Sequence, residues 1–214
     1  MIYLIVGRRE QGKTTLGLWM LRRGSAARAI FDPRGLITPW LGGEVVDTAD
    51  DLPLAFQMLN QRQLTEVVYR PVDDVSVAFR DFSRELAEWV RQDRTRGLRV
   101  LVDEAGFVQL ATTDFLWLLR CSQRDRVDVF ITAHRPADIP TDVRAIADHW
   151  LLFPIRQEHD LRVVSERCGS EVAARVETLP AHHCVHWDDS RSAWDVLADP
   201  TAWYLDLQQG VPYA

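Results

Sequence analysis

Lysine, cysteine and long apolar runs are all scarce in this chain of 214 residues. The three cysteines, Cys121, Cys168 and Cys184, are odd in number and widely spaced, which excludes a disulfide framework and a thiolate zinc site. No apolar run approaches the roughly 20 residues that cross a bilayer, and the N-terminus carries no basic leader. We therefore expect reduced thiols, no transmembrane segment and a cytoplasmic location.

The bulk composition is that of an ordinary soluble domain. Hydrophobic residues make up 47% of the chain and charged residues 26%, which is enough for one sizeable core. The formal net charge of -6 gives the whole molecule a field that repels nucleic acid. Any contact with DNA would therefore need a local basic surface.

Short β-branched runs alternate with longer amphipathic segments along most of the chain. This rhythm predicts an α/β fold, in which a mostly parallel central sheet is covered by helices on both faces. The expected strands are residues 2–6, 29–31, 66–69, 99–102, 127–132 and 149–153. The expected helices are residues 14–23, 52–61, 77–94, 113–123 and 141–147.

The pattern changes after Pro154. Residues 159–168 and 170–177 read as helices and residues 182–187 as a strand, before a tail that carries tryptophan. We expect a core over residues 1–155 and a small C-terminal extension, residues 156–214, packed on it within a single domain. The segment 33–43, rich in proline and glycine, is expected to be a mobile connection.

A phosphate-binding loop follows the first expected strand. The motif GxxxxGK[ST] is matched in full and opens a helix, so successive backbone N–H groups and the helix N-terminus can surround a phosphate. Lys13 is the lone lysine among 25 basic residues, and an ammonium suits crowded β- and γ-phosphates. Thr14 would ligate Mg²⁺. The predicted ATP-binding residues are Gly7, Arg8, Arg9, Glu10, Gln11, Gly12, Lys13, Thr14 and Thr15.

Two acidic residues, Asp103 and Glu104, end the expected strand 99–102. Ligands of open parallel sheets bind at the carboxyl ends of the strands, so both acids point to the same crevice as the loop. We predict that Asp103 binds Mg²⁺ and that Glu104 is the general base that polarises the attacking water. An exposed acidic pair is the alternative, but together with the loop the pair favours ATP hydrolysis.

His134 lies just beyond a third strand end, where it could sense the γ-phosphate, although a single histidine can equally be an ordinary loop residue. Other signals have simpler explanations. We expect no metal at His182, Cys184 and His186, because no partner cluster accompanies them. The arginines between residues 91 and 99 read as a solvated helix end, and the aromatic residues of the tail as a docking segment.

These motifs resemble the additional-strand P-loop ATPases of the FtsK/HerA group. Residues 31–35 resemble the DP[KRH]G-like motif of its second strand, and residues 118–136 resemble its helix, arginine and TQRP-like sensor stretch. The resemblance covers residues 2–155. It implies a RecA-like P-loop NTPase fold, a sensor strand between the strands of the phosphate loop and the acidic pair, and ATP-driven movement of DNA through a ring.

The short length, without a membrane anchor or a DNA-sorting accessory domain, makes the chain resemble most the genome-packaging ATPases of membrane-containing icosahedral viruses. The resemblance implies a hexameric or pentameric homo-oligomer, double-stranded viral DNA and capsid or portal vertex proteins as partners, and a place in the host cytoplasm or the virion. It also implies a trans-acting arginine, for which Arg124 is our choice, with Arg126 and Arg135 as rivals and Arg144 as a weaker candidate. His134 departs from a frequent glutamine. Alternatives are a morphogenesis ATPase of the zonular-occludens-toxin type and a nucleotide switch without translocation.

Overall fold

A single sheet organises the part of the chain that this computed structural model describes, residues 1–24, 26–92, 97–121 and 126–198. Within these ranges nine strands lie in the order β3-β4-β2-β5-β6-β1-β7-β8-β9. The strands from β3 to β7 in this order are parallel, and β8 and β9 add antiparallel pairs at one edge. Their bounds are β1 Ile2–Val6, β2 Ala27–Phe31, β3 Gly43–Val46, β4 Glu66–Tyr69, β5 Leu98–Val102, β6 Val127–Ala133, β7 His149–Leu152, β8 Cys184–Asp188 and β9 Ala193–Leu197.

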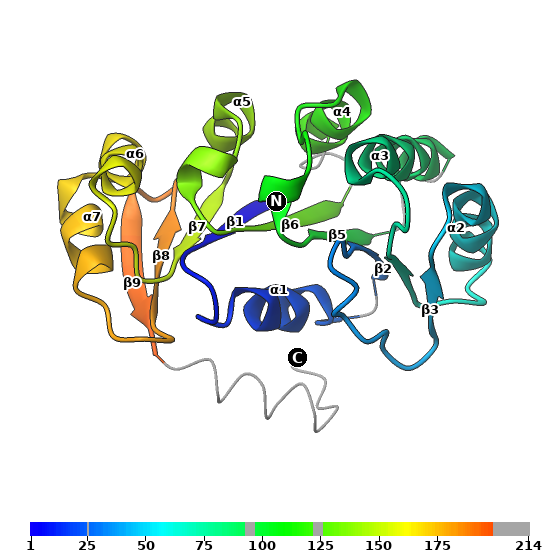
Figure 1. Cartoon of the computed structure of the whole chain (residues 1–214), viewed down its shortest axis with the longest axis horizontal. Coiled ribbons are helices and arrows are strands. Elements are labelled where there is room, and N and C mark those ends of the chain that lie inside the picture. The colour runs from blue at the N-terminus through cyan, green and yellow to red at the C-terminus, as the bar shows by residue number, and fades with distance from the viewer. Residues whose placement is uncertain (25, 93–96, 122–125, 199–214) are drawn as a thin grey trace.

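The helices cover the two faces of this sheet unequally. Helix α1 lies alone on one face, and the other helices line up across the opposite face (Figure 1). The predicted α/β fold with helices on both faces is confirmed. The helices are α1 Lys13–Leu21, α2 Leu52–Asn60, α3 Val75–Gln92, α4 Thr113–Cys121, α5 Thr141–Ala145, α6 Glu158–Cys168 and α7 Ser170–Glu177.

Each face of the sheet has its own apolar core. The larger core joins β-strand side chains to the row from α2 to α7, and the smaller one packs Leu16 and Leu21 of α1 against Ile30 and Leu101. Helix α1 approaches the sheet closely at Gly17, where an added Cβ would lie 3.0 Å from Cδ1 of Leu101. The central strands are therefore buried on both sides, which explains their continuous apolar sequences.

The strand order agrees with the expectation that the sensor strand, β6, lies between the strand of the phosphate loop, β1, and the strand of the acidic pair, β5. Strand β6 pairs with β1 on one side and with β5 on the other.

The sequence analysis missed two strands. Strand β3 begins at Gly43, where a mobile connection was expected, and β9 lies beyond the last predicted strand. Strand β9 is largely exposed, and β3 has only four residues, of which one is buried, so neither shows the apolar pattern that marks a buried strand.

The segment after residue 155 continues the same sheet. Strand β8 pairs with β7, and α6 and α7 pack beside them (Figure 1).

Burial raises the pKa of the Cys168 and Cys184 thiols to about 12, so both stay protonated. None of the described helices is long and apolar enough to cross a membrane. Trp203 and Tyr204 of the tail lie outside the described residues.

A buried carboxylate ties several elements together on the α1 side. Glu66, at the start of β4, is fully buried and accepts hydrogen bonds from Nη2 and Nε of Arg22 at 2.8 and 3.0 Å. It also accepts a bond from the backbone N–H of Trp40 at 2.8 Å, and Nε of Arg28 lies 3.5 Å away. This one side chain therefore joins the end of α1 and the loop before β3 to strands β2 and β4.

We predict that Glu66→Ala lowers the free energy of unfolding by about 3–5 kcal/mol, because removing one partner leaves buried guanidinium charge uncompensated. Urea unfolding followed by circular dichroism measures this change. Glu44→Ala, on the exposed part of β3, is the control and is expected to change stability by less than about 0.5 kcal/mol. Equal losses in the two variants would contradict the role given to Glu66.

Candidate nucleotide site

The loop between β1 and α1 curls tightly at the carboxyl edge of the sheet. Gly7 has a φ of 153°, and a Cβ there would lie 2.5 Å from Cβ of Phe153, so only glycine fits. Gly12, just before α1, has a φ of 95°, and Glu10 also adopts a left-handed φ of 61°. A chain bent in this way can turn its N–H groups inward, as a phosphate requires.

Lys13 is held at the centre of the site. Its side chain is largely buried, and Nζ donates to the backbone carbonyl of Arg8 at 2.9 Å and to Nδ1 of His134 at 3.3 Å. Burial lowers the pKa of Lys13, while the negative charges of Glu104 and Asp103 act in the opposite direction. The ammonium is therefore placed between its own loop and the end of β6.

Asp103 is buried between two threonine hydroxyls. Thr14, at the start of α1, and Thr132, on β6, donate to Oδ1 at 2.8 and 2.7 Å. Burial raises the pKa of Asp103, and these two hydrogen bonds oppose the rise. The hydroxyl of Thr14 and the carboxylate of Asp103 form a pair of hard oxygen ligands of the kind that Mg²⁺ prefers.

This pair fits a magnesium ion that is shared with phosphate. The described residues contain no group of three histidine, cysteine or acidic side chains that could hold a metal alone. Mg²⁺ commonly takes one or two protein oxygens and completes its shell with water and substrate phosphates. Thr14 and Asp103 are therefore sufficient as the protein's share of such a site.

Glu104 sits in a strained backbone conformation. Its φ and ψ are both 52°, in the left-handed region that costs a residue with a side chain on the order of 1–3 kcal/mol. The backbone N–H of Glu104 donates to Oγ1 of Thr132 at 2.9 Å, which fixes this turn. Oε2 lies 2.8 Å from Nε2 of His134, and Oε1 lies 3.4 Å from Nη1 of Arg34.

His134 connects the phosphate loop to the acidic pair. Burial lowers its pKa, and the positive charge of Lys13 lowers it further, so the imidazole is neutral at pH 7. Because Lys13 donates to Nδ1, we assign the proton to Nε2, which then donates to Glu104. Nε of Arg9 also approaches Nε2, at 3.4 Å, but the shorter contact with the carboxylate decides the tautomer.

The other predicted binding residues surround this centre less tightly. Arg8, Arg9 and Glu10 are exposed, and Thr15 is half-buried. The side chain of Gln11 accepts a hydrogen bond from the backbone N–H of His182 at 3.2 Å, which links the loop to the C-terminal part of the chain.

The proposed trans arginine, Arg124, lies outside the described residues. Among its rivals, Arg135 binds Oδ2 of Asp160 at 3.0 Å, and Arg144 donates to the hydroxyl of Thr141 on its own helix. Arg126 lies at the amino end of β6, on the other edge of the sheet from the phosphate loop.

Three residues of the site were missed by the sequence analysis. Thr132 bridges Asp103 and the backbone of Glu104, and Arg34 approaches the Glu104 carboxylate. Asp32 is fully buried, and its Oδ2 accepts the N–H of Ile37 at 2.7 Å. Each lies at or just after the end of a strand that reaches the same edge of the sheet. This position at a strand end is the sequence feature that could have identified them.

Comparison of the whole fold with solved structures gives strong likenesses at low sequence identity. The genome packaging NTPase B204 from Sulfolobus turreted icosahedral virus 2, solved in complex with ATP-gammaS, matches with a TM-score of 0.74 and 19% identity. The match covers 92% of this chain and 96% of that one. The amino-acid sequence itself matches no protein-family model and no curated protein.

Two more distant structures share the fold. VirB4 of Thermoanaerobacter pseudethanolicus has a TM-score of 0.65 at 9% identity, covering 93% of this chain and 90% of that one. The N-terminal domain of zonular occludens toxin from Neisseria meningitidis has a TM-score of 0.50 at 14% identity, covering 95% and 96%. The resemblance to P-loop ATPases of this architecture, inferred from motifs, is thus confirmed at the level of the fold.

We predict that Thr132→Val lowers the free energy of unfolding by about 1–3 kcal/mol, because it leaves the buried N–H of Glu104 unpaired and removes a hydrogen bond from Asp103. Thr132→Ser keeps the hydroxyl and is expected to lose less. Chemical denaturation of both variants measures the difference. A serine variant as unstable as the valine variant would show that the hydroxyl is not what matters.

Proposed function

We propose that this chain is an ATP-hydrolysing DNA translocase, a subunit of a viral genome-packaging motor. The observation that carries the proposal is the hydrogen-bonded chain from Lys13 through His134 to Glu104, beside the Thr14–Asp103 pair. The similarity to the packaging NTPase B204 over nearly the full length of both chains supports the packaging role. The proposed partners are double-stranded viral DNA, further copies of this chain in a pentameric or hexameric ring, and capsid or portal vertex proteins. The proposed location is the host cytoplasm or the virion.

In the proposed reaction the phosphates of ATP lie in the loop of residues 7–14. Lys13 would contact the β- and γ-phosphates, and Thr14 and Asp103 would hold Mg²⁺, which would supply positive charge to neutralise the phosphates. Glu104 takes a proton from water as the water oxygen bonds to the γ-phosphorus and the bond to the β–γ bridging oxygen breaks, giving ADP and phosphate. The neutral His134 orients the Glu104 carboxylate and responds to the γ-phosphate through Lys13.

Two other functions use the same nucleotide site. A morphogenesis ATPase of the zonular-occludens-toxin type is supported by the weaker fold match to that toxin's N-terminal domain. A nucleotide switch without translocation would need ATP binding but no fast turnover, and the buried, fixed Glu104 argues against it. Stimulation of ATP hydrolysis by DNA separates the translocase from both alternatives.

We predict that Glu104→Gln lowers the ATPase rate by about 10²- to 10⁴-fold, because an amide cannot accept the proton of water. ATP affinity, measured with a fluorescent analogue, is expected to persist in this variant and to fall sharply in Lys13→Ala. Steady-state ATPase assays of the wild type with and without double-stranded DNA complete the test. A wild-type rate that DNA leaves unchanged would contradict translocation and favour the two alternatives.

We also predict that the active site is shared between neighbouring subunits and completed by Arg124. The ATPase rate per subunit should fall on dilution, and Arg124→Ala should lose about 10³- to 10⁵-fold in rate. Co-expression of Arg124→Ala with Glu104→Gln should restore part of the activity, because some interfaces then combine an intact Glu104 with an intact Arg124. A mixed ring as inactive as its parents would count against a shared site.

A further inference from the structure

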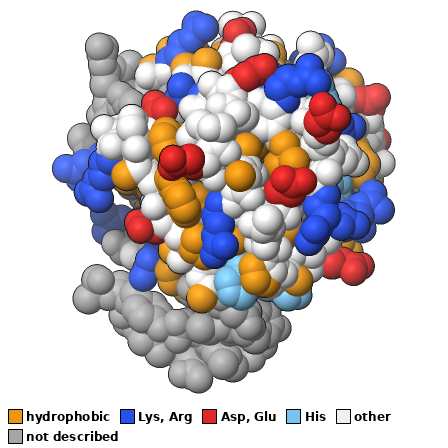
Figure 2. All heavy atoms as spheres, turned by 90° about the vertical axis from the view of Figure 1, so that its left-hand side faces the viewer, with side chains coloured by type: hydrophobic (Ala, Val, Ile, Leu, Met, Phe, Trp, Pro, Cys, Tyr) orange, Lys and Arg blue, Asp and Glu red, His pale blue; other side chains and the backbone are white. Residues whose placement is uncertain are grey.

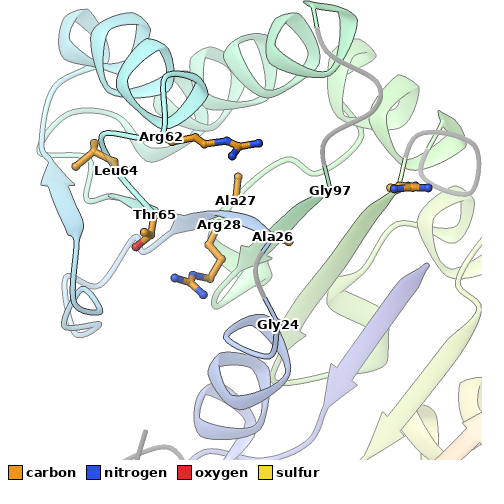
Figure 3. A pocket seen from close by; sticks show the side chains of 9 residues that line it. Gly24, Ala26, Ala27, Arg28, Arg62, Leu64, Thr65 and Gly97 are labelled. Atoms are coloured by element: carbon orange, nitrogen blue, oxygen red, sulfur yellow. The ribbon is translucent and has the colours of Figure 1, made fainter. Parts of the chain in front are cut away.

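A second cleft lies at the opposite edge of the sheet from the nucleotide site. Its volume is about 630 Å³, and it opens where β2, β5 and β6 begin, whereas the phosphate loop and the acids lie where β1 and β5 end. Figure 3 shows the opening between the turn that carries Arg62 and the start of β5 at Gly97. The lining residues are Gly24, Ala26, Ala27, Arg28, Arg62, Leu64, Thr65, Gly97 and Arg126.

The lining of this cleft is basic. Three of its nine residues are arginines and none is acidic, although the whole chain carries a net charge of -6. Neither Arg62 nor Arg126 forms an ion pair with any residue that the structure describes, and both are exposed. Because both side chains are exposed, an anion in solution can reach them.

The third arginine, Arg28, is buried deeper. Its Nε lies 3.5 Å from Oε2 of Glu66, outside hydrogen-bond geometry, and has no hydrogen-bond partner among the described residues. Glu66 already receives two hydrogen bonds from Arg22, so one carboxylate faces two guanidinium groups. The Arg28 guanidinium therefore lies beside Glu66 and Arg22, on the α1 side of β2, and not in the opening itself (Figure 3).

The two outer arginines both have left-handed backbone conformations. Arg62 has a φ of 62° and Arg126 a φ of 53°, both in the left-handed region, which costs residues with side chains on the order of 1–3 kcal/mol. Such strain is concentrated at functional sites more often than elsewhere. Figure 3 shows the Arg62 side chain reaching across the opening above Ala27, while Arg28 is directed to the other side of β2.

The chemistry of the lining suits a phosphodiester backbone better than a small ligand. Small-molecule pockets are mostly apolar or aromatic and enclosed, whereas this lining has no aromatic side chain and consists of arginines, small residues, Leu64 and Thr65. With few base-reading groups, the lining favours sequence-independent contacts to phosphate. The guanidinium groups of Arg62 and Arg126 come from separate segments and can contact different phosphates along a strand.

We infer that this cleft binds the phosphate backbone of a nucleic acid, at a site separate from the nucleotide site. The assignment rests on the proposed function, for which it supplies the local basic surface that an acidic protein needs to hold DNA. Strands β2, β5 and β6 each run from the cleft to the nucleotide site, where Asp32, Asp103 and Thr132 lie at or just beyond their ends. DNA held here would therefore contact the same strands that carry the hydrolytic residues.

The test compares two double variants of equal charge change. Arg62→Ala/Arg126→Ala removes the two cleft arginines that form no ion pair with a described residue. Arg80→Ala/Arg175→Ala removes two exposed arginines that form no ion pair with a described residue, on α3 and α7. Helix α7 lies at the far end of the sheet, and the face of the molecule at that end carries charges of both signs (Figure 2).

Fluorescence anisotropy with a labelled 30-base-pair duplex gives the affinity at several salt concentrations. We expect the cleft variant to bind DNA at least about tenfold more weakly than the control variant. The slope of log affinity against log salt concentration should be smaller in magnitude by about 1–2, because each lost phosphate contact removes about 0.9 from it. Affinity for a fluorescent ATP analogue should be equal in both variants, which also verifies that they fold.

Equal DNA affinity in the two double variants would overturn this assignment while leaving the proposed function intact. A cleft variant that binds the ATP analogue more weakly than the control variant, but binds DNA equally well, would also overturn it. Wild-type protein that binds no DNA under any of these conditions would overturn both the proposed translocase and the cleft. The two failures are therefore distinguishable.

Discussion

The position of β6 between β1 and β5 is the constraint on which the nucleotide site depends. Parallel pairing on both sides brings the end of β6 level with the phosphate loop and with the acidic pair. Thr132 can then donate to Asp103, while His134 spans the distance between Lys13 and Glu104. A β6 at any other place in the sheet would leave the two halves of the site without a connection.

Strain and hydrogen bonding act together at Glu104. Glu104 has a left-handed conformation directly after a buried strand and turns the chain abruptly. The turn leaves its backbone N–H without a partner in the sheet, and this N–H donates a hydrogen bond to the hydroxyl of Thr132. The same hydroxyl donates its proton to Asp103, so its orientation is fully determined. The two carboxylates are thus directed differently, one towards Thr14 and the other towards His134, which is what separate metal-binding and base roles require.

The parts of the site that could be predicted are those encoded in short segments. The loop of residues 7–14 and the pair Asp103–Glu104 combine a local motif with a strand context, and both reach one edge of the sheet. Arg34 and Glu66 have partners that lie 70 and 44 residues away, Glu104 and Arg22, and only the folded sheet reveals such pairs. Strand β9 was missed because exposed residues fill it, and β3 because only one of its four residues is buried. Hydrophobic periodicity detects only buried strands.

The unequal use of lysine and arginine fits the two edges of the sheet. At the carboxyl edge Lys13 is nearly buried, and its compact ammonium donates to a carbonyl and an imidazole within one narrow space. A guanidinium is planar and wider and would displace the loop around it. At the amino edge the opening is broad and the arginines are spread over separate segments, so long forked side chains suit an extended anion. The single lysine thus lies where the loop leaves room only for a compact cation, and arginines line the broader cleft at the other edge.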